Sequence, residues 1–145
     1  ASTFDAMNGY WTRDRNDVYF LNRAIQACDP TSFEVVFERW AMDAQCTYVA
    51  EARMDGADQP SFQVLGDNYA KDKYHVYARV NHISLITDPV TGAVRNVSET
   101  TVSRVREVDV KSFALSNNWA CDYDARDRLR CYRRGEAVSC DCGEQ

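Results

Sequence analysis

The stretch Tyr69-Ala70-Lys71-Asp72-Lys73-Tyr74-His75-Val76-Tyr77 carries a pattern that we find four times in this chain. The pattern is Phe, a second aromatic, Asp, Tyr and an aliphatic residue, and its copies are Phe4–Trp11–Asp14–Tyr19–Ile25, Phe33–Trp40–Asp43–Tyr48–Met54, Phe62–Tyr69–Asp72–Tyr77–Ile83 and Phe113–Trp119–Asp122–Tyr132–Val138. In the first three copies the internal steps are identical, at 7, 3, 5 and 6 residues, and successive Phe residues are 29 positions apart. A fixed period in this range predicts a tandem array of one small structural unit.

The residues around each Phe indicate what the unit builds. Asp-x-x-Ser precedes Phe33, Phe62 and Phe113, and both side chains favour turns because they bond nearby backbone amides. The second aromatic and the Tyr lie in β-favouring runs on either side of a polar turn, which predicts a hairpin. Each unit is therefore expected to hold three short strands. Residues 32–44 also show helical spacing, but Gly66 in the matching stretch of the next copy favours a strand.

This reading gives an all-β fold of four β-hairpin repeats of about 29 residues in one compact or solenoid-like domain. The expected segments of this single domain, 1–145, are four copies, an inserted β-rich hairpin and strand, and a Cys-containing tail: 1–27, 28–56, 57–83 and 109–138 for the copies, 84–108 for the insertion and 139–145 for the tail. The insertion is placed between the third and fourth copies because the step from aliphatic residue to Phe there is 22 residues longer than elsewhere. In the fourth copy, the extra residues are placed in the turn before Tyr132.

The stretch from Tyr69 to Tyr77 resembles the signature of the DKNYY repeat family, a group of mostly bacterial proteins. Tyr74 stands where that signature has Asn, and Ala78 stands where it has a second Tyr. The other three copies keep the Asp and a following Tyr. The resemblance implies a repeat architecture and no particular reaction, because the family carries no established activity.

Composition limits the classes of partner. The formal net charge of −5 argues against nucleic acid, which needs a concentrated excess of Lys and Arg. No apolar run approaches the length of a membrane span, so no membrane insertion is expected. The start Ala1-Ser2-Thr3 is typical of a mature end left by signal-peptide cleavage.

The six cysteines Cys28, Cys46, Cys121, Cys131, Cys140 and Cys142 are an even and high number, which in a secreted chain predicts three disulfides. Their spacing lacks the paired clusters of a metal site. We expect Cys28 to pair with Cys46, and Cys121 with Cys131 across the last hairpin. Cys140 and Cys142 are then left, with a bridge between chains as one option. Asn96-Val97-Ser98 is a sequon, so Asn96 is a glycosylation candidate in a eukaryotic secreted protein.

Most aromatic residues are expected in the core, because large rings at repeat positions dominate burial in small units. The predicted repeat core is Phe4, Trp11, Tyr19, Phe33, Trp40, Tyr48, Phe62, Tyr69, Tyr77, Phe113, Trp119 and Tyr132. The remaining aromatics are the better candidates for contacts with a partner: Tyr10, Phe20, Phe37, Tyr74 and Tyr123. No loop has the acidic ligands that calcium needs, so the repeated Asp is expected to cap a turn.

No catalytic constellation is visible, and no catalytic residue, cofactor or metal ligand is predicted. The leading hypothesis is therefore a secreted, non-enzymatic structural protein of the extracellular space or cell surface. It would be the subunit of a filament or surface appendage, built by head-to-tail contact between copies with uncapped ends. A monomeric secreted module that binds glycan or a surface protein is the alternative. A small secreted enzyme is a second alternative, because acid pairs assembled in three dimensions cannot be read from sequence.

Overall fold

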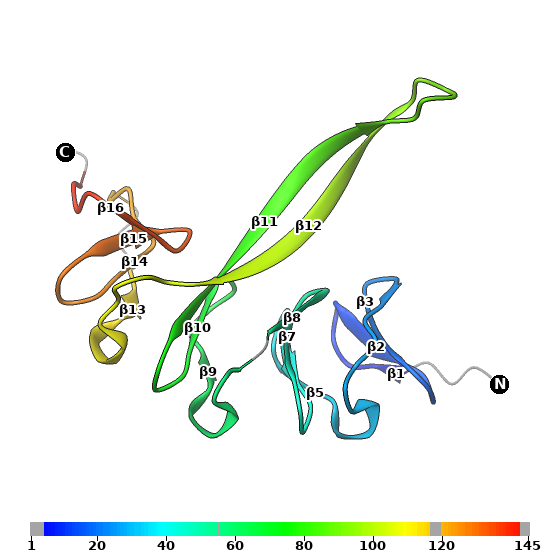
Figure 1. The fold of residues 1–145 in the computed structure, drawn as a ribbon, viewed down its shortest axis with the longest axis horizontal. Coiled ribbons are helices and arrows are strands. Elements are labelled where there is room, and N and C mark those ends of the chain that lie inside the picture. The colour runs from blue at the N-terminus through cyan, green and yellow to red at the C-terminus, as the bar shows by residue number, and fades with distance from the viewer. Residues whose placement is uncertain (1–4, 55, 117–119, 143–145) are drawn as a thin grey trace.

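The computed structural model describes residues 5–54, 56–116 and 120–142. This part of the chain is all-β, with four antiparallel four-stranded sheets and three short 3₁₀ turns. Figure 1 shows the sheets following one another in chain order, with a long two-stranded arm projecting from the third. The Phe4 and Trp119 positions of the predicted core lie outside the described residues.

Each sheet is an open meander in which every strand pairs with its neighbour in sequence. The first sheet contains β1 (Asp5–Ala6), β2 (Trp11–Arg13), β3 (Val18–Phe20) and β4 (Arg23–Ala24). The second contains β5 (Glu34–Phe37), β6 (Trp40–Met42), β7 (Thr47–Val49) and β8 (Ala52–Met54). The third contains β9 (Gln63–Val64), β10 (Tyr69–Lys71), β11 (Val76–Thr87) and β12 (Val94–Arg104). The fourth contains β13 (Ala114–Leu115), β14 (Ala125–Arg126), β15 (Cys131–Arg133) and β16 (Glu136–Val138).

Each sheet has four strands, one more than the three that the sequence predicted for each unit. The Phe-associated strand and the hairpin form as expected, but the aliphatic residue lies on or beside a fourth strand that folds back through a two-residue turn. The Asp-x-x-Ser sequences form the 3₁₀ turns η1 (Pro30–Ser32), η2 (Gln59–Ser61) and η3 (Val110–Ser112), each of which ends at the following Phe. Residues 34–37 form a strand, as the repeat register indicated.

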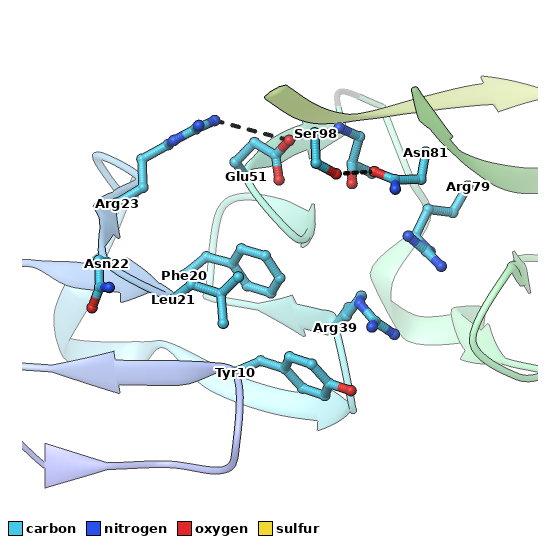
Figure 2. Close-up of a pocket in the computed structure, with 11 residues that line it drawn as sticks. Tyr10, Phe20, Leu21, Asn22, Arg23, Arg39, Glu51, Arg79, Asn81 and Ser98 are labelled. Atoms are coloured by element: carbon cyan, nitrogen blue, oxygen red, sulfur yellow. Dashed lines mark hydrogen bonds and ion pairs between the residues drawn. The ribbon is translucent and has the colours of Figure 1, made fainter. Parts of the chain in front are cut away.

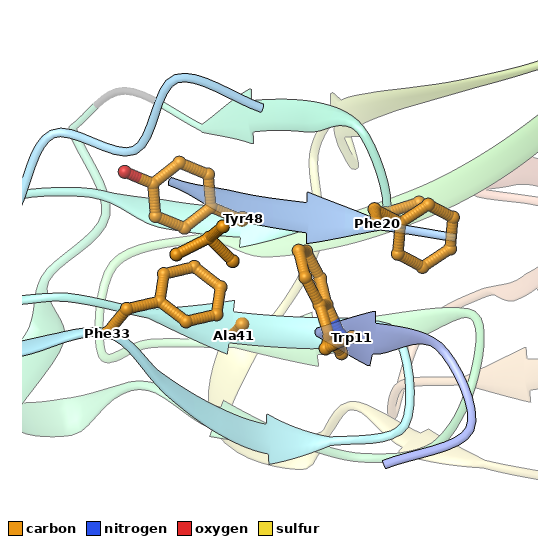
Figure 3. Packing of buried hydrophobic residues seen from close by; sticks show 7 residues of the cluster. Trp11, Phe20, Phe33, Ala41 and Tyr48 are labelled. Carbon is orange, nitrogen blue, oxygen red and sulfur yellow. The ribbon is translucent and has the colours of Figure 1, made fainter. Parts of the chain in front are cut away.

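The apolar core lies between successive sheets. Phe33 sits with its ring centroid 5.2 Å from that of Trp11 in the preceding sheet and 5.4 Å from that of Tyr48 in its own sheet (Figure 3). Phe62 lies in the same way between Trp40 and Tyr77, and Phe113 between Tyr69 and Tyr132. Each Phe therefore joins two sheets, which explains why the sequence pattern spaces one Phe and two other aromatics so regularly. Two of the predicted core residues, Phe62 and Tyr19, are only half-buried.

A buried Asp organises the turn before each Tyr. One oxygen of Asp72 accepts hydrogen bonds from the N–H groups of Tyr74 and His75, and the other accepts from the Asp58 N–H and the Tyr77 hydroxyl. Asp43 makes the same four bonds in the second sheet. We call this arrangement the Asp–Tyr bracket; it ties the 3₁₀ turn to the hairpin. In the first sheet Asp14 accepts three bonds from described residues, all within the hairpin.

In the fourth sheet the bracket is built by Asp127, so the choice of Asp122 was wrong. Asp127 accepts from Asp109, Leu129, Arg130 and Tyr132 and is buried, whereas Asp122 is exposed and pairs with Arg133. The step from Asp127 to Tyr132 is five residues, as in the other copies. The extra residues lie between β13 and β14, where a longer connection leaves the bonded turn unchanged.

The bracket sets the ionisation of its members. Burial alone would raise the pKa of Asp127, but the backbone N–H groups and the Tyr132 hydroxyl outweigh it and lower that pKa to about 2. Burial and the bond to Asp127 raise the pKa of Tyr132 to about 12. The pKa of Asp43 and that of Asp72 are lowered in the same way. Because these carboxyls have lower pKa values in the folded state, their stabilisation is complete above about pH 4 and is lost as the pH falls through their folded pKa values.

The insertion lies inside the third sheet, not after it. β11 continues from Tyr77 through Ile83 to Thr87 without a break, and β12 pairs with it along the whole length. Val105 is opposite Val76 and is buried, whereas Ile83 is 69 % exposed, so Val105 is the aliphatic residue of the third copy. From Val105 to Phe113 is eight residues, as in the other copies. A lengthened hairpin leaves the strand pairing at its base intact, which is why 22 residues fit here.

Three disulfides are present, as predicted, and the pairing of Cys28 with Cys46 is confirmed. The pairing of Cys121 with Cys131 is wrong: Cys121 bonds Cys142, and Cys131 bonds Cys140. Both bonds lie within one chain, so no cysteine remains for a bridge between chains. The reason is the fold of the tail, which returns along the fourth sheet after β16.

The disulfide pattern predicts a specific tryptic map without reduction. Peptides 112–126, 131–133 and 135–145 should run as one linked species, because both bonds converge on the tail. Peptides 24–39 and 40–53 should form a second linked pair. Mass spectrometry checks this, and recovery of 135–145 as a separate peptide would contradict the structure.

The bracket predicts a graded loss of stability. Replacing Asp72 with Ala removes a buried acceptor of four hydrogen bonds and should lower the free energy of unfolding by about 3 kcal/mol or more. Tyr77→Phe should cost about 1–2 kcal/mol, since one bond is lost. Asp14→Ala is the matched control and should cost less than Asp72→Ala, because Asp14 is less buried and makes fewer bonds. Urea denaturation measures all three, and equal losses at Asp14 and Asp72 would refute the role given to the fourth bond.

Candidate functional site

The arm is the first candidate for a functional surface. We define it as residues 79–102, the part of β11 and β12 that replaces a two-residue turn, with the connection between them. In the other sheets the matching turns are Leu21-Asn22, Ala50-Glu51 and Arg134-Gly135, and the first residue of each has a φ between 51° and 55°. At the matching place Arg79 continues the strand, so the hairpin does not close until residues 88–93.

One face of the arm carries exposed aliphatic side chains among polar ones. Residues that are paired across an antiparallel ladder share a face, and every second residue lies on the same face. Ile83, Leu85 and Val94 therefore lie together, and they are 69 %, 72 % and 60 % exposed. Asn96, the predicted glycosylation candidate, lies opposite Leu85 on this face and is exposed. Exposed aliphatics gathered on one face are unusual for a free surface and are typical of a contact surface.

The arm has few contacts with the rest of the protein. A free two-stranded ribbon is marginally stable in water, because neither face is covered. At its base, the Thr100 N–H donates to the Glu51 carboxylate at 2.6 Å, which links the arm to the second sheet. Beyond that point, β12 lies at the edge of its sheet in the described part of the chain.

A groove at the base of the arm is the second candidate. It has a volume of about 510 Å³ and lies between the first two sheets and the arm (Figure 2). Its walls combine apolar and cationic side chains: Tyr10, Phe20, Leu21, Asn22, Arg23, Arg39, Glu51, Arg79, Asn81, Ser98 and Thr100. Tyr10 and Phe20 are two of the five aromatics that were expected to make contacts.

Asp67 binds both Arg39 and Arg79, two of the cationic residues that line the groove. Asp67 accepts two bonds at 2.6 Å from Arg39 and lies 3.5 Å from Arg79, whose Nε donates to the Asp67 carbonyl. The Arg39 guanidinium also lies 4.4 Å above the Tyr10 ring, a cation–π contact. Burial lowers the pKa of Arg79. This cluster ties the first three sheets together, and Arg39 remains partly exposed toward the groove.

The other candidate residues do not gather. Phe37 and Tyr74 are exposed on the second and third sheets, and the Tyr123 hydroxyl lies near the Cys142 sulfur. His75 packs edge-on against Tyr77, while His82 bonds Thr101 on the arm. Among the described residues no group of His, Cys, Asp and Glu is placed to hold a metal ion. The described part of the chain also contains no helix long and apolar enough to cross a bilayer.

Sequence reasoning predicted the arm only in part and missed the groove. Residues 84–97 were predicted as a hairpin and residues 100–108 as a separate strand, but nothing in the sequence showed that both continue the third hairpin as one pair of strands. The groove combines residues from three sheets, which no local pattern reveals.

Comparison with known proteins identifies the family. The sequence profile of the DKNYY family matches residues 40–136, which is most of the second sheet and the third and fourth sheets. No curated protein and no solved structure matches the chain. The Asp and the last Tyr of the stretch 69–77 are the two residues that bond each other in the bracket.

The cationic cluster generates a stability prediction. Asp67→Ala should lower the free energy of unfolding by about 1–2 kcal/mol, because it leaves Arg39 and Arg79 close together without their acid. Asp122→Ala is the matched control: its ion pair with Arg133 is exposed on both sides and should be worth no more than about 0.5 kcal/mol. Chemical denaturation compares them, and an equal effect would show that the cluster has no special role.

Proposed function

This chain belongs to the DKNYY family, and on that premise we propose that it is a secreted, non-enzymatic assembly protein whose copies contact one another through the arm. The observation that carries the proposal is the long hairpin with exposed aliphatic side chains on one face and an open backbone edge. Three disulfides support an oxidising compartment, hence the extracellular space or the cell surface. The four sheets act as copies of one unit in an open array that serves as a rigid base for the arm.

The two ends of the array are not equivalent. On the fourth sheet Cys131 and Arg133 occupy the positions that Val76 and Ala78 hold on the third. Arg133 is charged, and the disulfide from Cys131 fixes the tail there. This outer face therefore does not offer the apolar surface that stacking another sheet requires, so we place the contact between copies on the arm.

A filament requires a second contact in addition to the arm, since one two-fold contact gives only a closed pair. Charge offers one. Residues 5–57 hold nine acidic and five basic side chains, whereas residues 104–134 hold five acidic and eight basic ones. Acidic and basic regions on the same chain favour head-to-tail contact between copies, and salt would weaken it.

The groove favours a second candidate function, a binding module for glycan or protein. Arg39 and the aromatic side chains at its base offer the mixed polar and apolar surface that such ligands use. Titration with acidic and neutral oligosaccharides, followed by NMR, would favour this candidate if shifts were confined to the groove of a monomeric protein.

Shortening the arm tests the leading proposal. A variant in which residues 84–97 are replaced by Asn-Gly joins Ile83 to Ser98 through a two-residue turn and keeps the base of the arm. We expect the native protein to show a sedimentation coefficient that rises with concentration, and the variant to remain monomeric. Leu85→Ser should reduce association, while Leu129→Ser, at an equally exposed site on the fourth sheet, should not. A native protein that stays monomeric at all concentrations would refute the proposal.

A further inference from the structure

The outer edge of β12 has backbone groups oriented for pairing with another strand. The Val105 N–H donates inward to the Val76 carbonyl, and the Thr100 N–H points outward to Glu51. Because orientation alternates along a strand, the even-numbered residues Val94, Asn96 and Ser98 also present their N–H and C=O groups outward. The eleven pairs between β11 and β12 run without a bulge, so this edge is regular.

The edge has few of the features that usually prevent pairing between chains. Such edges are protected by Pro, by charged side chains, especially Lys, by bulges or by a covering element. From Val94 to Ser103 the strand has no Pro and no Lys, and its only charged residues are Arg95 and Glu99. Neither makes an ion pair with another described residue. Their two charges are four residues apart and of opposite sign.

From these features we infer that β12 pairs antiparallel with β12 of a second copy, about a two-fold axis at Val97, which rests on the proposed assembly through the arm. In this register the residue numbers of opposing partners sum to twice 97, so Arg95 lies opposite Glu99 of the second copy and Glu99 lies opposite its Arg95. Asn96 and Ser98 then lie opposite one another and exchange backbone hydrogen bonds. The two arms join into one continuous four-stranded sheet.

Charge selects this register over its neighbours. Centring the axis on Asn96 or Ser98 leaves Arg95 and Glu99 without each other, and centring it on Arg95 or Glu99 places like charges together. Opposite charges directly across an antiparallel pair are favourable and like charges are unfavourable. Arg95 and Glu99 lie on the face of the arm away from Leu85, so Leu85 of both copies lies on the other face of the joined sheet.

The structure also sets where the pairing ends. Glu51 already accepts the Thr100 N–H, so the edge beyond Glu99 is occupied by the second sheet. Pairing is therefore limited to residues 95–99 of each copy. A contact this short gives weak, reversible association.

Charge exchange between copies tests the inference. Arg95→Glu and Glu99→Arg should each weaken self-association about tenfold or more, since each places two pairs of like charges across the axis. Mixing the two variants should restore association, because every opposing pair is then of opposite sign. The readout is sedimentation velocity of each variant and of the equimolar mixture.

A cross-link tests the register itself. Val97 lies on the axis at a non-hydrogen-bonded pair, where two Cβ atoms come within disulfide reach. Val97→Cys should therefore form a covalent dimer under mild oxidation, and the matched variants Asn96→Cys and Ser98→Cys should form far less.

The outcomes separate the two levels of the argument. If the native protein associates through the arm but the mixture is not restored, or if Asn96→Cys links as well as Val97→Cys, the β12 register is wrong and assembly through the arm stands. If the native protein is monomeric throughout, both the inference and the proposed function are wrong. Restoration in the mixture together with a dimer specific to Val97→Cys supports the pairing.

Discussion

A buried carboxylate that accepts four hydrogen bonds is the constraint on which the rest of this structure depends. In the second, third and fourth sheets it joins three parts of one unit: the turn that carries it, the Tyr of the next strand and the 3₁₀ turn ahead of the Phe. Desolvation of the charge is offset by the donors, which also fix the direction in which Tyr and Phe point. Since each Phe then contacts the aromatic ring of the preceding sheet, a local polar motif sets the spacing of the sheets.

The units differ most at the two ends, and the differences have a common physical reason. Inner sheets contact a neighbour on both faces, so both faces carry apolar residues. The fourth sheet has no following sheet among the described residues, and its outer face carries Arg133 at the position where the third sheet has Ala78. The two disulfides of the tail hold the chain against this sheet, where hydrophobic contact alone would be weak.

The features that depend on local spacing could be predicted from the sequence. The period, the strand class, the turn ahead of each Phe and the Cys28–Cys46 bond could all be predicted, because neighbouring residues determine them.

The positions of the insertions could not be predicted from the sequence. Ile83 fits the spacing of the third copy as well as any aliphatic residue, and only the pairing of Val76 with Val105 shows that the hairpin has been lengthened from within. Asp122 was preferred to Asp127 for a similar reason, since counting from Trp119 ignores where the fold tolerates extra residues. Disulfide connectivity in the tail depends on how residues 139–142 return, which spacing does not encode. The groove is invisible for the same reason, as its walls come from separate sheets.

The place of the arm has a consequence for how such proteins diversify. The arm grows from a turn position that the other three sheets also possess, at Leu21-Asn22, Ala50-Glu51 and Arg134-Gly135. Material added there leaves the bracket, the Phe contacts and the eight-residue step to the next unit untouched. The four sheets of the described chain therefore share one insertion site, the turn between the last two strands, and only the third sheet has a long insertion there. Evolution can change the segment inserted at such a turn without redesigning the scaffold, and a recognition hairpin grafted onto the exposed turn at Leu21-Asn22 would use the same freedom.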